Sequence, residues 1–301
     1  MLKKIYRTIA PNPLDRLLKK ATAKKQKKIL LAWNRGLGDI ALGLYAVVHR
    51  IRELIPESEI TFLTRENLKD GFKLLEGVSI LVDPSWKRGK PYDVHTSLLG
   101  LGIAPSSFDL IIEHPDPTYW VKWQLGTLTP KLQWNKEWDS LWKNFDLKKE
   151  ERYIAVHPHT ETSYGMGRNW PAASWQELLF RITEKHGFKV ILFGYEPLPL
   201  FLGDDLIDLR GKTTLYELLS IIKNCCRSLI VLDSGISSMT YFLDDSFPLQ
   251  LVSLWGNPRM GILKQNVASP NPQLQHVPIL GENEDIKQIT AAEVEKILFP
   301  K

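Results

Sequence analysis

The sequence contains little cysteine and no long apolar run. Only two of its 301 residues are cysteines, and Cys225 and Cys226 are adjacent. Neighbouring cysteines rarely bridge each other, so a disulfide-stapled domain is excluded and a reducing cytoplasm is favoured. No stretch of 18 apolar residues occurs, so no membrane-spanning helix is predicted. The N-terminus also lacks the apolar segment and the small-residue cleavage site of a secretory signal.

Basic residues are in excess only near the N-terminus. Residues 1–28 hold ten Lys or Arg against the single acid Asp15, a net charge of +9, whereas the whole chain carries +5 and the remainder therefore −4. Because that remainder has no basic stripe, nucleic-acid binding is not expected. Leu14, Leu17 and Leu18 share one side of a possible short helix with basic residues nearby. This segment either binds an anionic membrane surface or is a solvated, partly disordered tail, and the sequence favours neither.

Apolar runs alternate with helical patterns along most of the chain, which predicts an α/β fold with parallel sheets. The expected strands are residues 29–33, 59–64, 108–113, 153–157, 188–193, 228–232 and 249–255. The expected helices are residues 39–55, 170–186, 213–224, 236–243 and 290–298.

The charged stretch 146–152 suggests a domain boundary. We expect a basic leader over residues 1–28, one β/α domain over residues 29–150 and a second over residues 151–301. Ligands of such domains bind at the carboxyl ends of parallel strands, here in a cleft between the two domains.

Residues 116–147 contain five of the ten tryptophans and do not form a clean β/α unit. These aromatic rings could pack on a sugar, although core packing is the simpler interpretation for most of them.

The segment "GLGDIA" at residues 36–41 fits the dinucleotide-binding pattern G-x-G-x-x-G/A. However, Asp39 would repel a pyrophosphate at the start of the following helix. The acidic residue that should hold a ribose after the second strand is also missing, since Thr64 and Arg65 occur there. Asp39 therefore either caps the helix or acts as a general base.

In the second half, the segments 157–171 and 232–239 follow predicted strands and lead into predicted helices. Free N–H groups at the second of these helix starts suit a diphosphate. His157 and His159 lie two residues apart with no third ligand suggested, so we expect structural histidines and no metal site.

Four segments in order, "NRGLGDIALG", "RNWPAASW", "DLRGKTTLYELLSIIKNC" and "LIVLDSGISSM", resemble glycosyltransferase family 9 over residues 29–256. The resemblance implies a GT-B arrangement, in which two Rossmann-like domains face each other across a cleft. It implies an inverting, metal-independent and cofactor-free transfer of a sugar, typically heptose from ADP-heptose. The implied acceptor is a lipopolysaccharide-core or related glycolipid. Such an enzyme of lipopolysaccharide biosynthesis would be cytoplasmic, with possible peripheral attachment to the inner face of the cytoplasmic membrane.

By this resemblance, Asp39 occupies the place of the proposed base, which takes a proton from the acceptor hydroxyl. Gly36 and Gly38 allow the tight turn that carries it. Arg35 could meet a phosphorylated or carboxylated acceptor, or simply form a surface ion pair. These four residues form the predicted acceptor side of the site.

The predicted donor side lies in the second half. Arg168 stands where the family carries a lysine for the donor diphosphate, and arginine keeps that charge. Hydroxyl groups in the same loop could bind phosphate or merely cap the loop, and a glutamate in "FGYEP" matches a ribose-binding residue of the family. Ser238 replaces a family histidine, which favours the alternative of a degenerate member that binds a nucleotide or glycan without transfer. The predicted donor residues are Thr160, Thr162, Arg168, Glu196, Asp233, Ser234 and Gly235.

Overall fold

The computed structural model describes residues 12–161 and 167–300 and divides the chain into two units, residues 1–130 and 131–301. Each unit is built on its own parallel sheet, so the predicted α/β class is confirmed. The predicted functional boundary at residue 150 stays a prediction. The two compact units of the structure meet between residues 130 and 131 of the sequence.

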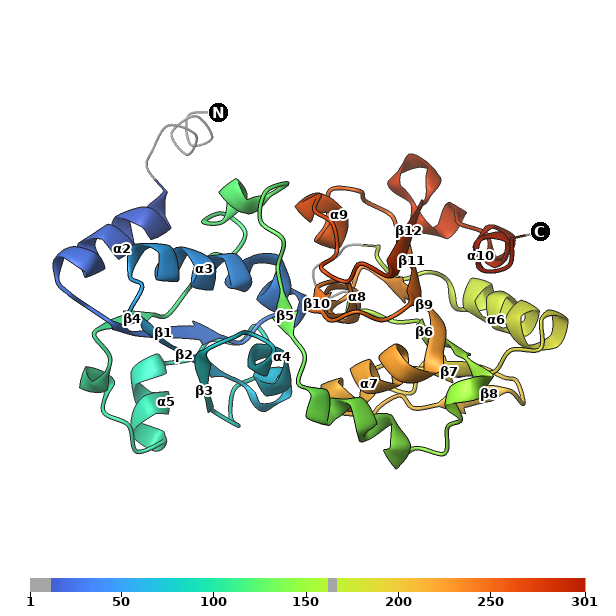
Figure 1. Cartoon of the computed structure of the whole chain (residues 1–301), viewed down its shortest axis with the longest axis horizontal. Helices are drawn as coiled ribbons and strands as arrows, with labels where there is room; N and C mark the ends of the chain where they lie inside the picture. Colours follow the sequence, from blue (N-terminus) through green and yellow to red (C-terminus); the bar gives the residue numbers. More distant parts are fainter. Residues whose placement is uncertain (1–11, 162–166, 301) are drawn as a thin grey trace. The chain divides into compact units, whose positions relative to one another are not determined.

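Unit 1 contains a four-stranded parallel sheet in the order β3-β2-β1-β4. Its strands are β1 (Lys28–Trp33), β2 (Glu59–Thr64), β3 (Val78–Val82) and β4 (Leu110–Ile112). Its helices include α2 (Pro13–Ala23), α3 (Tyr45–Leu54), α4 (Lys69–Lys73) and α5 (Val94–Gly100). Figure 1 shows α2 and α3 on one face of this sheet and α5 on the other.

The central strand β1 is buried at every position after its first residue. Such a continuous apolar run is typical of a parallel strand covered on both faces. Leu30 and Ala32 pack toward Val94 and Leu98 of α5, and the alternate residues of β1 face the opposite side.

Helix α2 falls inside the predicted leader. Asn12 caps it by accepting a hydrogen bond from the N–H of Leu14 at 2.9 Å, and Pro13 follows at the first helical position. Leu14 and Leu18 are fully buried, whereas Lys19 on the other side is exposed. The apolar side of this amphipathic helix is therefore covered by unit 1, and its basic side remains at the surface. In the part of the chain described here, no helix is both long and apolar enough to cross a membrane.

Unit 2 contains a six-stranded parallel sheet in the order β12-β11-β9-β6-β7-β8. Its strands are β6 (Tyr153–His157), β7 (Val190–Leu192), β8 (Leu206–Asp208), β9 (Cys226–Leu232), β11 (Leu249–Trp255) and β12 (Leu274–Leu280). Its helices include α6 (Ala172–Phe180), α7 (Leu215–Cys225), α8 (Gly235–Tyr241), α9 (Gly261–Gln265) and α10 (Ala291–Leu298). Figure 1 shows α6 and α10 on one side of this sheet and α7 and α8 on the other.

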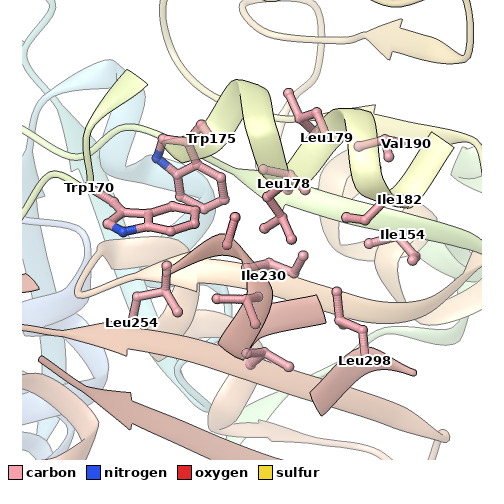
Figure 2. Packing of buried hydrophobic residues seen from close by; sticks show 14 of the residues in the cluster. Ile154, Trp170, Trp175, Leu178, Leu179, Ile182, Val190, Ile230, Leu254 and Leu298 are labelled. Atoms are coloured by element: carbon pink, nitrogen blue, oxygen red, sulfur yellow. The ribbon is translucent and has the colours of Figure 1, made fainter. Parts of the chain in front are cut away.

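The core of unit 2 joins α6 and α10 to the sheet. Figure 2 shows Leu178 and Trp175 of α6 above the buried strand residue Ile230. The indole of Trp170 meets Trp175 edge to face at 4.9 Å and donates a hydrogen bond to the carbonyl of Ile289 at 2.9 Å. Because Trp170 is anchored on both sides, the loop before α6 leaves the sheet in a fixed direction.

The tryptophan-rich stretch divides between the two units, and its part from residue 131 onward belongs to unit 2. The short strand β5 (Leu132–Gln133) pairs with β10 (Leu243–Asp244), and the following 3₁₀ segment Lys136–Asn144 packs on α7. Trp138 stacks on Tyr216 at 4.0 Å, and the N–H of Trp142 donates to Ser220 at 3.1 Å. These two tryptophans pack the segment against α7 while each stays partly exposed, so they lie at the border of the core and not inside it.

Candidate functional site

The turn after β1 is held by hydrogen bonds to its carbonyl groups. The indole of Trp33 donates to the carbonyl of Gly36 at 3.2 Å. Arg65, which follows β2, donates to the carbonyls of Asn34 at 3.2 Å and Arg35 at 3.0 Å. Two neighbouring parallel strands thus fix one loop at the carboxyl edge of the sheet.

Asp39 lies half-buried in the first turn of the helix that this loop enters. Its Oδ2 accepts a hydrogen bond from the backbone N–H of Gly36 at 3.2 Å, so the carboxylate bonds backward along the chain and makes no forward cap. A Cβ at position 36 would stand 2.7 Å from that same Oδ2. Gly36 therefore lets the carboxylate approach the backbone of the predicted tight turn, and a Cβ here would displace the Asp39 side chain. Gly38 is the first helical residue.

A π-helical segment, Ile40–Leu44, follows Asp39 directly and precedes α3. Insertions of this kind inside helices occur frequently at functional sites. A Cβ at Gly43 would lie 2.5 Å from Pro117, so this glycine lets the segment after β4 approach the helix.

Basic residues gather around the same edge of unit 1. The side-chain amide of Asn34 donates to the carbonyls of Lys87 at 3.0 Å and Lys90 at 2.9 Å, which ties the segment after β3 to the end of β1. Lys87, Lys90 and the exposed Arg35 thus lie near one another, together with Arg65. Sequence reasoning selected only Arg35. Basic residues after successive parallel strands were the signal that could have found the others.

In unit 2, Arg168 and Asp233 come together from loops 65 residues apart in sequence. The guanidinium donates to the carbonyl of Glu161 at 2.6 Å and to that of Asp233 at 3.4 Å, and it lies 3.6 Å from the Asp233 carboxylate. Its Nε is buried without a hydrogen-bond partner among the described residues. Burial raises the pKa of Asp233 above its ordinary value, and the Arg168 charge opposes that shift.

Helix α8 begins at the residues predicted to bind a diphosphate. Ser234 is its N-cap, and the side chain of Ser237 completes a reciprocal capping box. The N–H groups of Ser234 and Ser237 are therefore occupied, which leaves those of Gly235 and Ile236 from the first four. The sequence suggested a fuller set of free donors. Ser238, at the place of the family histidine, is fully buried and donates back to the Ser234 carbonyl at 3.3 Å.

The remaining predicted donor residues differ in their surroundings. Thr160 is buried, and Asn169 holds its backbone with a pair of hydrogen bonds, 2.8 Å to the N–H and 3.0 Å to the carbonyl. Thr162 lies outside the described residues. Glu196 is exposed in the loop after β7, and the contacts found among the described residues do not join it to Arg168. Sequence reasoning missed Asn169, although it neighbours Arg168 in "RNWP".

His157, the last residue of β6, is buried, and burial lowers its imidazole pKa to about 4. A neutral ring at this position fits a structural role. No three His, Cys, Asp or Glu side chains within residues 12–161 and 167–300 are grouped as a metal site would require.

Comparison with solved structures identifies the fold. The glycosyl transferase family 9 structure from Veillonella parvula aligns with a TM-score of 0.59 and 16% identity, over 90% of this chain and 95% of that chain. The E. coli ADP-heptose lps heptosyltransferase II aligns with a TM-score of 0.62 and 16% identity, over 90% and 97%. E. coli heptosyltransferase WaaC, solved with ADP-2-deoxy-2-fluoro heptose, aligns with a TM-score of 0.50 and 14% identity, over 90% and 99%. No protein-family model matches this chain, and neither does any curated protein. The chain thus has the fold of these structures, in agreement with the resemblance carried by its motifs.

Proposed function

We propose that this protein is an inverting, metal-independent glycosyltransferase. Its donor is a nucleoside-diphosphate sugar, with ADP-heptose as the first candidate, and its acceptor is a lipopolysaccharide-core or related glycolipid. The observation that carries this proposal is the Arg168 guanidinium beside the Asp233–Ser234 turn, at the carboxyl edge of the unit 2 sheet. The fold shared with two heptosyltransferases supports the choice of donor.

On the donor side, negative charge builds on the diphosphate as its bond to the sugar breaks. The Arg168 side chain is only 20% exposed, and a guanidinium held mostly out of water stabilises that charge more than a fully solvated one would. The Arg168 guanidinium lies 3.6 Å from the Asp233 carboxylate, a separation that leaves room for a stronger bond to phosphate. The N–H groups of Gly235 and Ile236 add neutral donors.

On the acceptor side, Asp39 accepts the proton of the attacking hydroxyl. The hydroxyl oxygen forms a new bond to the anomeric carbon while the bond from that carbon to the diphosphate breaks, which inverts its configuration. The hydrogen bond from Gly36 orients the carboxylate for this transfer. Arg35, Arg65 and Lys87 suit an acceptor that carries phosphate or carboxylate groups.

We further propose that the exposed basic side of α2 holds the protein on an anionic cytoplasmic membrane surface. Each basic residue near such a surface contributes about 1 kcal/mol of attraction. Because Leu14 and Leu18 are buried in unit 1, the contact is electrostatic and does not insert these leucines. Raising the salt concentration should therefore release the protein from vesicles that contain phosphatidylglycerol.

The function is tested with nucleotides and a transfer assay. ADP, UDP, GDP and CMP are compared for their ability to raise the melting temperature, and release of nucleoside diphosphate from the sugar donor is followed with and without acceptor. Stabilisation by one nucleoside diphosphate together with acceptor-dependent release supports the proposal. If no nucleotide stabilises the protein, the donor site is wrong.

One observation favours a second candidate, a protein that binds a nucleotide or glycan without transfer. Ser238 is turned inward, so the diphosphate would lack the contact that the family histidine suggests at this position. Stabilisation by a nucleotide without any donor turnover would identify this second function.

A further inference from the structure

A cavity of about 330 Å³ opens at the amino edge of the unit 2 sheet, at the strand ends opposite to those that lead to Arg168 and Asp233. Its walls come from the starts of β6, β9, β11 and β12 and from the segment that ends α10. Cavities of this size lie within the range that small-molecule sites occupy. No residue in the proposed transfer reaction accounts for it.

A row of polar side chains crosses three neighbouring strands at this cavity. The parallel register pairs Ser228 of β9 with Gln250 of β11, and Gln250 with Gln275 of β12. The Ser228 hydroxyl donates to the Gln250 side chain at 2.9 Å, and the Gln250 amide donates to the carbonyl of Ile297 at 3.1 Å. These bonds fix Gln250. The amide of the exposed Gln275 has no hydrogen bond to any residue that the structure describes.

Two guanidinium groups line the same cavity. The Arg227 guanidinium carbon lies 4.9 Å from the ring centroid of Phe188 and 5.6 Å from that of Phe299. The same guanidinium donates one long hydrogen bond, 3.4 Å, to the carbonyl of Leu298. A guanidinium has five N–H donors, so most of those on Arg227 remain available. The side chain of Arg152, which directly precedes β6, forms no ion pair or hydrogen bond within the described part of the chain.

No acidic side chain of the described residues lines the cavity beside these two arginines. The two guanidinium groups repel each other, and a bound anion attracts both and so offsets that repulsion. The planar fork of arginine matches the paired oxygens of phosphate and carboxylate groups.

We propose that this cavity binds a small molecule through a phosphate or carboxylate group, which accepts hydrogen bonds from Arg152 and Arg227 and from the amide of Gln275. The aromatic rings preorganise Arg227, so ordering the site on binding costs less than it would for a free side chain. The proposal does not depend on the transfer reaction, since its residues and those of the donor site lie at opposite ends of the strands.

The test titrates inorganic phosphate into the full chain and measures the melting temperature and the heat of binding. Arg152→Gln is the informative variant, because Arg152 is exposed and its loss should not disturb the core. Lys149→Gln removes one exposed positive charge close by in sequence without altering the cavity lining. Arg168→Gln reports on phosphate that binds at the donor site instead.

We expect saturable phosphate binding in the wild type that weakens about tenfold or more in Arg152→Gln, the loss expected for one charged hydrogen bond. Lys149→Gln should bind phosphate as the wild type does, and Arg168→Gln should keep the Arg152-dependent binding while losing only phosphate held at the donor site. A parallel titration with acetate distinguishes a carboxylate ligand from a phosphate ligand, and Arg152-dependent binding of either supports the proposal. Three results would overturn it: no saturable binding of either anion, equal binding by wild type and Arg152→Gln, or an equal loss in Lys149→Gln.

Discussion

Replacing Asp39 by Asn separates the chemistry of this carboxylate from its structural contribution. The amide keeps an oxygen that can accept the Gly36 N–H, now 3.2 Å from Oδ2, but it cannot take a proton from a hydroxyl. Loss of a general base lowers a rate by about 10²- to 10⁴-fold. That range corresponds to roughly 3–5.5 kcal/mol of activation free energy. The free energy of unfolding should change little, because the hydrogen bond survives.

Asp39→Ala provides the structural counterpart. It removes the same base and also the hydrogen bond to Gly36, which is worth about 0.5–1.5 kcal/mol of unfolding free energy. A loss of 1 kcal/mol lowers the melting temperature of a chain of 150–250 residues by about 2–4 °C, and this longer chain should respond at the lower end. The two variants should therefore lose transfer equally and differ in stability, as measured by nucleotide release and thermal unfolding.

Asp109→Asn is the matched control. Asp109 accepts hydrogen bonds from the N–H groups of Lys27 and Lys28, both at 2.8 Å, at the amino edge of the same sheet. This control variant should transfer sugar at the wild-type rate. If Asp39→Asn also kept the wild-type rate, the assignment of the base would be refuted. An equal loss of transfer rate in Asp109→Asn would show that the loss does not depend on a general base at position 39.

Three further predictions concern unit 2. Arg168→Gln should weaken binding of a nucleoside diphosphate about tenfold or more, as measured by calorimetry. Arg168→Lys should be intermediate, because lysine keeps the charge but loses the planar fork. Gly261→Ala should lower the melting temperature, since its Cβ would collide with the Asp233 carboxylate and the backbone φ of +47° disfavours alanine, whereas Gly100→Ala meets open space and should be neutral. Burial lowers the pKa of His157 to about 4, below the unfolded value of about 6.5, so its imidazole is neutral in the folded protein. Its contribution to stability should be complete above pH 6.5 and fall by about 1.4 kcal/mol per pH unit toward pH 4, a slope that chemical denaturation should find reduced in His157→Gln.

Strand patterning in the sequence located most of the sheet residues. The largely buried strands β1, β6, β9 and β11 were each predicted within one or two residues. Three strands at sheet edges, β3, β8 and β12, were missed, because each is covered incompletely and β12 contains Pro278. A strand at the edge of a sheet needs less apolar surface, and its sequence signal is weaker.

The candidate site was predictable in its residue types and less so in its contacts. The motifs selected Arg168 and Asp233, and the fold brings them together. They did not reveal that Ser237 closes a capping box or that Ser238 points inward, because both depend on the direction each side chain takes from α8. Similarly, the basic helix α2 was predicted as amphipathic, yet only its packing on α3 decides which side meets solvent.

The sequence by itself determined the α/β class and the glycine turn that carries Asp39, because apolar periodicity and the backbone freedom of glycine are local properties. Tertiary structure alone decided that Arg65 would hold the carbonyl groups of that turn. It likewise decided that Arg152 and Arg227 would line one cavity, since they precede or begin strands that are far apart in the chain and adjacent in the sheet. The order of strands in the sheet decides which distant residues become neighbours. That order depends on how separate elements pack, which no local pattern encodes.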